Sequence, residues 1–291
     1  MINVLLQTTI EHDDNDWSIE RFSKLMEFLA TVRDERGHPM FNVTARDRAR
    51  LGDPDPVLST LHDSDFDELW LFAVDTGDGL TTYDCLGISK FRQRGGGLLL
   101  TRDHMDLGSS LCTLGGVAAA HHFHSSNKDP DVSRHRIDDP FTTDILWPNY
   151  HSGANGDFQR VRAVGDAHPV LRDPHAAGGL VEFLPSHPHE GGVSAPPDDP
   201  SARVILQGNS AATGVAFNLA VAFESAAHGG RAIAQSTFHH FCDYNWDIDS
   251  GAPSFVGEAP GDGMKRNPDA LRSTKQYVLN VASWLAGGQP M

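Results

Sequence analysis

The sequence predicts an α/β domain built on an open, mostly parallel sheet with helices on both faces. Short apolar runs such as FDELWLFAV and GLLLT are typical of strands that are buried on both faces. Segments of helical periodicity lie between these runs, and strands that alternate with helices form right-handed βαβ crossovers. Hydrophobic residues make up 39% and charged residues 21% of the 291 residues, which predicts one folded domain with a sizeable core.

The first hundred residues supply most of the parallel sheet. We expect, in chain order, a strand at INVLLQT, a helix over 17–32, a brief strand at 41–43, a strand over 66–74, a helix over about 81–92 and a strand over 97–101. The glycines of QRGGG are typical of the end of the second helix.

Regular patterns stop between about residues 125 and 200, where turn-forming and polar residues dominate. This stretch is too long for a plain connection, so we expect an insertion or lid within the single domain 1–291. Further strands are predicted at VILQG, VAFNLAVAFE and GGRAIAQ, followed by a terminal amphipathic helix over 267–285. The whole pattern predicts a flavodoxin-like sheet.

The net charge predicts the kind of partner, and the cysteines and the first residues predict the location. The net charge of −16 repels phosphate backbones and anionic lipid, so we expect a small-molecule substrate, with neither nucleic acid nor membrane as a partner. The sequence leaves open whether the protein forms a homo-oligomer. The three widely spaced cysteines form no CxxC pair, and the start MINVLLQTTIEHDD has no basic region followed by a long apolar stretch. The expected location is the cytoplasm.

A first group of reactive side chains follows the predicted strand GLLLT. Asp103, His104 and Asp106 lie in TRDHMD, and ligands of open α/β sheets bind beyond the carboxyl ends of the strands. A carboxylate beside an imidazole can act as a base with its orienting partner, or the two can bind a metal. The alternative is that Asp103 caps the next helix while His104 packs without a chemical role.

A second group follows the predicted strand GGRAIAQ. It contains His239, His240 and Asp243, and imidazole with carboxylate oxygen suits borderline cations. Side chains of adjacent residues on an extended segment point in opposite directions, so we expect one of the two histidines to face the pocket.

A third group lies at AAAHHFHSS. His122 and His124 would project to the same side of an extended backbone and allow a shared ligand, although an exposed polar loop would explain the same residues. Further along, His151 has neighbours of the kind that line sugar-binding clefts, namely Asn149, Tyr150 and Asn155.

Together these groups define the predicted site. The catalytic candidates are Asp103, His104, His239 and His240, and the candidate substrate-binding residues are Asn149, Tyr150, His151 and Asn155. The candidate ligands of a divalent metal such as Zn²⁺ are His104, His122, His124, His239 and Asp243. A GxSxG elbow and an HExxH helix are both absent from the sequence. Cys112 could be a nucleophile, but a lone cysteine among small apolar residues is more often packed in a core.

Four segments resemble the trehalose-utilisation (ThuA-like) family of the class I glutamine amidotransferase-like superfamily. They are the amino-terminal strand, FDELWLFAVDTGDGLT, FRQRGGGLLLTRDH and GGRAIAQSTFHHF, and with the terminal helix they cover most of the chain outside the insertion. In glutaminase members of that superfamily, a sharp turn after the strand equivalent to GGLLLT bears a nucleophilic cysteine. Here the turn carries Asp103 and His104, so glutamine hydrolysis through a thioester is not expected.

The resemblance implies an enzyme of carbohydrate metabolism that hydrolyses or isomerises a sugar derivative. Asp103 with His104 would act as the base and its partner, and His239 or His240 as an opposing acid or a ligand. The rival hypothesis is a noncatalytic sugar-binding or scaffold domain on the same frame. Histidines that gather around one cavity would favour the enzyme, and scattered histidines the rival.

Overall fold

The computed structural model describes residues 1–139, 141–224 and 229–288, and its centre is an eight-stranded sheet in the order β2-β1-β3-β4-β12-β11-β10-β7. The strands are β1 (Ile2–Thr8), β2 (Phe41–Arg46), β3 (Glu68–Phe72), β4 (Gly97–Thr101), β7 (Arg162–Ala163), β10 (Ala202–Asn209), β11 (Ala216–Phe223) and β12 (Ala232–Gln235). The five strands from β2 to β12 are parallel, in the strand order of flavodoxin-like folds. The predicted α/β fold with a largely parallel sheet is confirmed.

The remaining three strands of this sheet run antiparallel to their neighbours. The six residues 210–215 join β10 to β11, and such a short connection suits a hairpin because a parallel crossover needs a dozen residues or more. The apolar runs predict these strands but say nothing of their direction.

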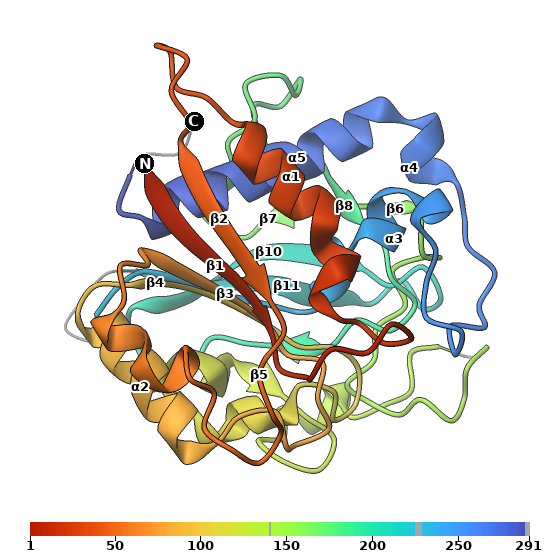
Figure 1. Ribbon diagram of the computed structural model, residues 1–291. Helices are drawn as coiled ribbons and strands as arrows, with labels where there is room; N and C mark the ends of the chain where they lie inside the picture. The colour runs from red at the N-terminus through yellow and green to blue at the C-terminus, as the bar shows by residue number, and fades with distance from the viewer. Residues whose placement is uncertain (140, 225–228, 289–291) are drawn as a thin grey trace.

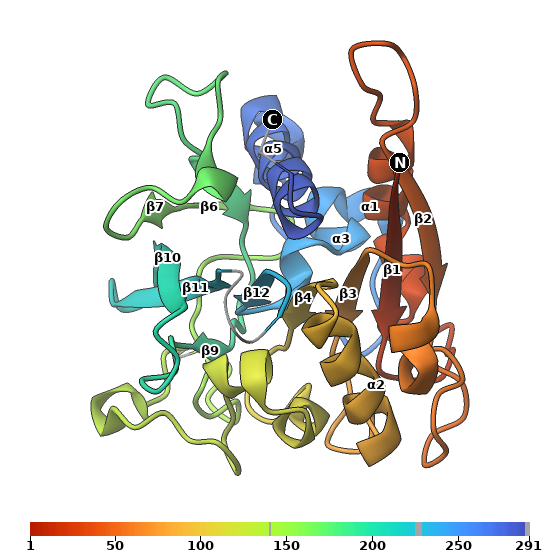
Figure 2. The same ribbon diagram turned by 90° about the vertical axis from the view of Figure 1, so that its left-hand side faces the viewer.

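Helices cover both faces of the sheet (Figures 1 and 2). On one face lie α1 (Ser23–Thr31), α3 (Asp243–Trp246) and α5 (Pro268–Leu285), and on the other lies α2 (Thr82–Gln93). A further short helix, α4 (Gly263–Arg266), directly precedes α5 in the chain. A capping box between Thr81 and Asp84 starts α2 where the sequence predicts a helix start.

Short 3-10 turns complete the helical structure. They are η1 (Ile19–Phe22), η2 (Leu58–Asp63), η3 (Ser109–Thr113), η4 (Gly116–Ala120), η5 (Val132–Arg134), η6 (Pro169–Leu171), η7 (Phe238–His240) and η8 (Ile248–Ser250). The single helix predicted over 17–32 is therefore a 3-10 turn followed by α1.

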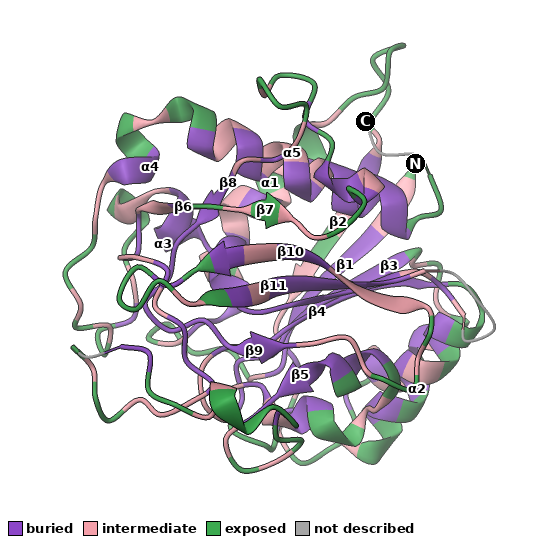
Figure 3. Ribbon diagram, turned by 180° about the vertical axis from the view of Figure 1, so that it is seen from behind, coloured by how far each residue is buried: buried purple, intermediate pink, exposed green. Residues whose placement is uncertain are grey.

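Two large apolar layers, one on each side of the sheet, form most of the core, and a small third cluster contains Phe183, Met264 and Ala270. Val4 and Leu6 of β1 pack in the layer that includes α1 and α5, whereas Leu5 packs in the layer that includes α2. Figure 3 shows the central strands buried and the outer sides of the helices exposed. Burial on both faces explains why the parallel strands read as continuous apolar runs.

The described residues between 125 and 200 contain turns and short strands. β6 (Phe158–Arg160) pairs with β8 (Phe183–Pro185), and β9 (Gly192–Val193) pairs with β5 (His121–His122). The description of this stretch as an insertion or lid stays a prediction. Among the residues that the structure describes, no helix is both long and apolar enough to cross a membrane.

His121 of β5 should make stability depend on pH. Burial and the nearby Arg102 guanidinium lower the pKa of His121 from 6.5 to about 3. Because the unfolded chain binds the proton more readily between these values, the stabilisation is complete above pH 6.5 and is lost as the pH falls towards 3. We expect the wild type to lose on the order of 3 kcal/mol more than His121→Gln between pH 6.5 and 4. Urea unfolding of both proteins at both pH values checks this, and equal losses would contradict it.

Candidate metal centre

Asp103 and His104 lie at the carboxyl end of β4, where the chain turns sharply. Met105 has a φ of 46°, which few residues other than glycine adopt. The turn is held by Arg102, whose buried guanidinium donates a hydrogen bond of 2.5 Å to the carbonyl oxygen of Met105. The strand therefore ends by presenting a carboxylate and an imidazole beyond the sheet.

The segment 186–190, which follows β8, packs directly against this turn. At Gly191 an added Cβ would lie 2.1 Å from Arg102 Nη1 and 2.4 Å from the carbonyl oxygen of Asp103, so the close approach requires glycine. The backbones of Tyr150 and Glu190 exchange hydrogen bonds of 2.9 and 3.0 Å. These contacts place His187 beside Asp103.

Asp103, His104 and His187 form a group that can hold a metal ion, with one candidate ligand atom from each within 4.8 Å of the others. His104 Nδ1 lies 2.8 Å from Asp103 Oδ2, and Thr237 Oγ1 donates to Asp103 Oδ1 at 2.7 Å. His187 Nε2 lies 3.5 Å from the same Oδ1. Asp103 is 1% exposed and His187 4%, so water is largely excluded from both side chains.

A chain of amide hydrogen bonds sets the tautomer of His187. Asn245 Nδ2 donates to the carbonyl oxygen of Ser186 at 2.9 Å and to Asn155 Oδ1 at 2.8 Å. Asn155 Oδ1 must therefore accept, and His187 Nδ1, 2.8 Å away, must donate. The lone pair of His187 is then on Nε2, which is buried without a hydrogen-bond partner.

The ring of His239 is held in the same way and stacks on that of His187. Its Nδ1 lies 2.8 Å from Asn245 Oδ1, which accepts, so its Nε2 also carries a lone pair. The two ring centroids are 3.5 Å apart. Burial lowers the pKa of His187 to about 4 and that of His239 well below its usual range, so both rings are neutral at pH 7.

Two hydrogen-bond acceptors thus face each other across the candidate centre. Burial opposes ionisation of Asp103, but the hydrogen bond from His104, with 2.8 Å between Nδ1 and Oδ2, favours the charged carboxylate. The 3.5 Å between Asp103 Oδ1 and His187 Nε2 is too long for a hydrogen bond. It matches the separation of about 3.4 Å between two ligands of a tetrahedral zinc ion. One carboxylate with two imidazoles is a donor set of catalytic metal sites, so these residues fit a divalent cation.

A cavity of about 370 Å³ adjoins this group. Trp17, Phe238 and Phe255 supply aromatic walls, whereas His189 and Glu258 supply polar ones. His189 Nε2 lies 2.9 Å from Glu258 Oε1. Mostly apolar walls with a few convergent polar groups are typical of small-molecule sites.

Four of the residues predicted from sequence line this cavity: Asp103, His104, Asn155 and His239. His240 points elsewhere, with its Nε2 3.3 Å from the buried Glu190 and its Nδ1 2.7 Å from Gln235 Nε2. The carboxylate of Asp103 bonds to the side chains of Thr237 and His104, so its contacts do not support the alternative that it caps a helix.

The other predicted metal ligands lie outside the cavity lining. His122 lies within hydrogen-bond distance of Ser194 Oγ and the carbonyl oxygen of Asn127, and His124 of the carbonyl oxygen of Trp147. The prediction that His122 and His124 project to the same side assumed an extended backbone through both residues. In the structure β5 ends at His122, so this assumption fails. Asp243 accepts from the backbone of Ser23 and Lys24 at the start of α1, where a carboxylate favours the helix dipole.

Three predicted substrate-binding residues also lie outside the cavity lining. Tyr150 stacks on Phe217 with ring centroids 4.7 Å apart. Asn149 is buried, and its side-chain amide has no hydrogen-bond partner among the described residues. His151 lies near Asp139, with 3.5 Å between Nδ1 and Oδ2.

Sequence reasoning missed His187, His189 and Glu258. All three come from turn-rich segments whose composition predicts loops. The usable signal was the alternation His187-Pro188-His189, because residues two apart on extended backbone point to the same side.

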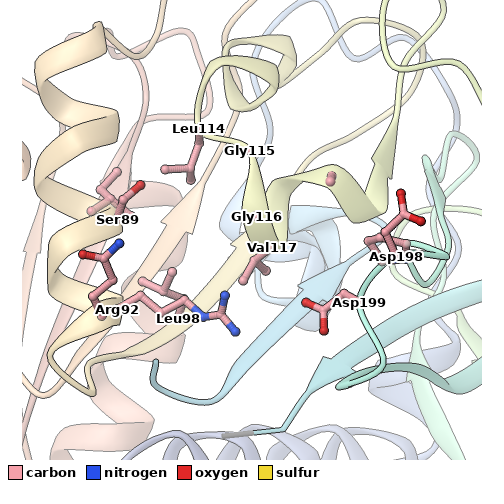
Figure 4. A pocket seen from close by; sticks show the side chains of 13 residues that line it. Ser89, Arg92, Leu98, Leu114, Gly115, Gly116, Val117, Asp198 and Asp199 are labelled. Atoms are coloured by element: carbon pink, nitrogen blue, oxygen red, sulfur yellow. The ribbon is translucent and has the colours of Figure 1, made fainter. Parts of the chain in front are cut away.

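A second cavity, of about 440 Å³, lies between α2 and the segment that leads into β10 (Figure 4). Asp198 and Asp199 line it across from α2, and Leu98 marks the amino end of β4, opposite the metal centre. The described residues that line it include no histidine or cysteine. The catalytic candidates predicted from the sequence are not among its lining residues.

Comparison with known proteins adds a distant structural likeness. No family model matches the chain, and no curated protein matches it. A crystal structure of Agd3, described as a novel carbohydrate deacetylase, is similar with a TM-score of 0.41 and 14% sequence identity. The match covers 81% of this chain and 29% of that one, so this chain spans less than a third of that protein. The resemblance to the trehalose-utilisation family stays a prediction.

Asn155 should tune metal affinity through the orientation of His187. Replacing Asn155 with Ala removes the oxygen that accepts from His187 Nδ1, and the loss of such an orienting partner weakens metal binding about 10- to 100-fold. Zn²⁺ titration calorimetry on the metal-free protein checks this. Asn155→Asp keeps an acceptor oxygen and is the matched control with near wild-type affinity. An unchanged affinity in Asn155→Ala would contradict the role.

Proposed function

We propose that this protein is a metal-assisted hydrolase of a small sugar derivative. The observation that carries the proposal is the unpartnered Nε2 of His187, which faces the carboxylate of Asp103 beside His104. A divalent metal such as Zn²⁺, when bound, would supply a Lewis acid that activates water and polarises the bond to be broken. A site with three protein ligands favours hydrolysis over isomerisation, because it leaves positions for water and substrate.

The other polar residues of the cavity would handle the proton. His239 presents the lone pair of Nε2 at neutral pH and can accept a proton or serve as a further ligand. On another wall, His189 with Glu258 forms an imidazole–carboxylate pair within hydrogen-bond distance, which can donate to a leaving group.

The cavity and surface charge support the substrate class. Trp17 and Phe255 have ring centroids 6.5 Å apart and offer aromatic faces against which the C–H faces of a sugar ring can pack. The volume of about 370 Å³ lies within the range of small-molecule sites. The net charge of −16 disfavours nucleic acid and anionic membranes as partners.

The test combines metal analysis with a substrate screen. Protein reconstituted with Zn²⁺ is analysed by plasma mass spectrometry, and its hydrolysis of a panel of acylated sugars and disaccharide derivatives is followed. We expect bound metal that Asp103→Asn loses, and turnover that chelation abolishes and zinc restores. A metal-free protein after reconstitution would overturn the proposal. Sugar binding without turnover would favour the noncatalytic sugar-binding domain.

A further inference from the structure

We propose that the cavity of about 440 Å³ between α2 and the segment that leads into β10 is a binding site for an aliphatic amino acid. Such a ligand carries a carboxylate, a protonated amine and an apolar side chain. The site is independent of the proposed function, because the cavity is lined by Leu98 at the amino end of β4, whereas Asp103 lies beyond the carboxyl end of the same strand. The volume lies within the range of small-molecule sites.

Arg92 supplies the positive charge of this cavity. The residue is 7% exposed, and its guanidinium projects from α2 toward the side of the cavity that carries Asp199 (Figure 4). Its Nε donates to the carbonyl oxygen of Gly230 at 3.0 Å, whereas its Nη2 is buried without a hydrogen-bond partner among the described residues. A buried cation with unused donors is costly, and the fork of N–H groups on a guanidinium matches a carboxylate. Arg92 would therefore bind the carboxylate of the ligand.

Two carboxylates, those of Asp198 and Asp199, line the opposite side of the cavity (Figure 4). Asp199 Oδ1 accepts from the backbone nitrogen of Ser201 at 2.9 Å and from its Oγ at 2.6 Å, which fixes the orientation of this carboxylate. Burial lowers the pKa of Arg92, and the charge of Asp199 opposes that shift. One guanidinium against two carboxylates disfavours phosphates and dicarboxylates, and it favours a ligand whose second charge is positive. The amine of the ligand would lie on this side.

Aliphatic side chains supply an apolar wall. They belong to Ile88 of α2, Leu98 of β4, Leu114 and Val117. Leu98 and Val117 are each 2% exposed, so this wall is part of the rigid core rather than of a surface loop. A branched hydrocarbon chain placed against the wall would leave water, which favours an aliphatic amino acid over a polar one.

Titration calorimetry of the full chain with L-leucine tests the site without an activity assay. Two probes that each lack one charged group are measured beside it, namely 4-methylpentanoate without the amine and 3-methylbutylamine without the carboxylate. We expect leucine to bind more tightly than either probe. Equal binding of leucine and 4-methylpentanoate would contradict a role for the amine. A protein that binds no leucine, or that binds succinate more tightly, would overturn the proposal.

Variants of the charged residues test the two ends of the ligand separately. Arg92→Gln should weaken the binding of leucine and of 4-methylpentanoate by about 10- to 100-fold, because both probes lose the partner of their carboxylate. Asp198→Asn should weaken the binding of leucine alone, since 4-methylpentanoate has no amine. Lys90→Gln is the matched control, because it removes a positive charge from the exposed side of the same helix, outside the cavity lining. It should bind leucine like the wild type.

Ser89→Trp provides a second variant should Arg92→Gln fail to fold, and circular dichroism monitors folding. Ser89 is half-buried and lines the cavity from α2, three residues before Arg92, so an indole there should fill the space and block the ligand (Figure 4). Leucine binding that persists unchanged in folded Arg92→Gln or in folded Ser89→Trp would overturn this site. The proposed function would stand in either case, because it depends on the other cavity.

Discussion

Replacement of His187 by alanine is expected to remove the metal at Asp103 and His104 and to abolish hydrolysis. His187 supplies the unpartnered Nε2 of the group, and its ring is held by Asn155 rather than by the metal itself. A Lewis-acid contribution of several kcal/mol corresponds to a loss of about a thousandfold or more in kcat/KM. Metal analysis of His187→Ala and steady-state kinetics on the substrate found in the screen check this expectation.

The control for His187→Ala is the exposed His38, which lies outside the cavity lining. His38→Ala should keep the metal content and the rate of the wild type. Near-ultraviolet circular dichroism distinguishes a lost ligand from a lost fold. A folded His187→Ala protein with wild-type metal content would show that His187 is not a ligand.

Glu190→Ala is expected to cause the largest loss of stability, roughly 3–5 kcal/mol in the free energy of unfolding. Glu190 is fully buried and accepts from Ser152 Oγ at 2.5 Å, Ser236 Oγ at 2.9 Å and Gln159 Nε2. His240 Nε2 lies 3.3 Å from Glu190 Oε2, the oxygen that also accepts from Ser236. Alanine would leave Ser236 Oγ and His240 Nε2 buried without an acceptor, and unsatisfied buried groups are expensive. Ser152 Oγ and Gln159 Nε2 would keep the carbonyl oxygens of His187 and Pro185 as acceptors.

Urea unfolding with the slope of the transition measured for each protein tests the Glu190 prediction. The control is Asp249→Ala, because the side chain of Asp249 is 67% exposed and pairs with the exposed Lys265. We expect the control to change stability by less than about 1 kcal/mol. A similarly small change in Glu190→Ala would contradict the idea that this network holds the segment 186–190 in place.

Much of the sheet could be predicted because its signals are local. The run GLLLT coincides with β4, and INVLLQT coincides with β1. Each strand is buried on both faces, so a continuous apolar run was enough to identify it. The position of Asp103 and His104 followed from the rule that ligands bind at the carboxyl ends of parallel strands.

The adjacent His239 and His240 show what the local sequence cannot predict, namely which of two neighbouring side chains faces the cavity. The two rings follow one another in η7, yet His239 lines the cavity and His240 enters the core. Their partners decide this: Asn245 holds His239, whereas Gln235 and Glu190 hold His240. The polar partners of His240 are buried, so it serves the core rather than the cavity.

The amino-acid sequence by itself determined the open parallel sheet, the order of its early elements and the placement of Asp103 and His104 at a strand end. Only the tertiary structure decided that His187 joins them, since its segment lies more than eighty residues along the chain and has no periodicity of its own. A strand depends on the burial of its own side chains, whereas a metal centre depends on contacts between distant segments. Here those contacts are the close approach of the Gly191 backbone to Arg102 and the hydrogen bond between Asn155 and His187. No local sequence pattern encodes either contact.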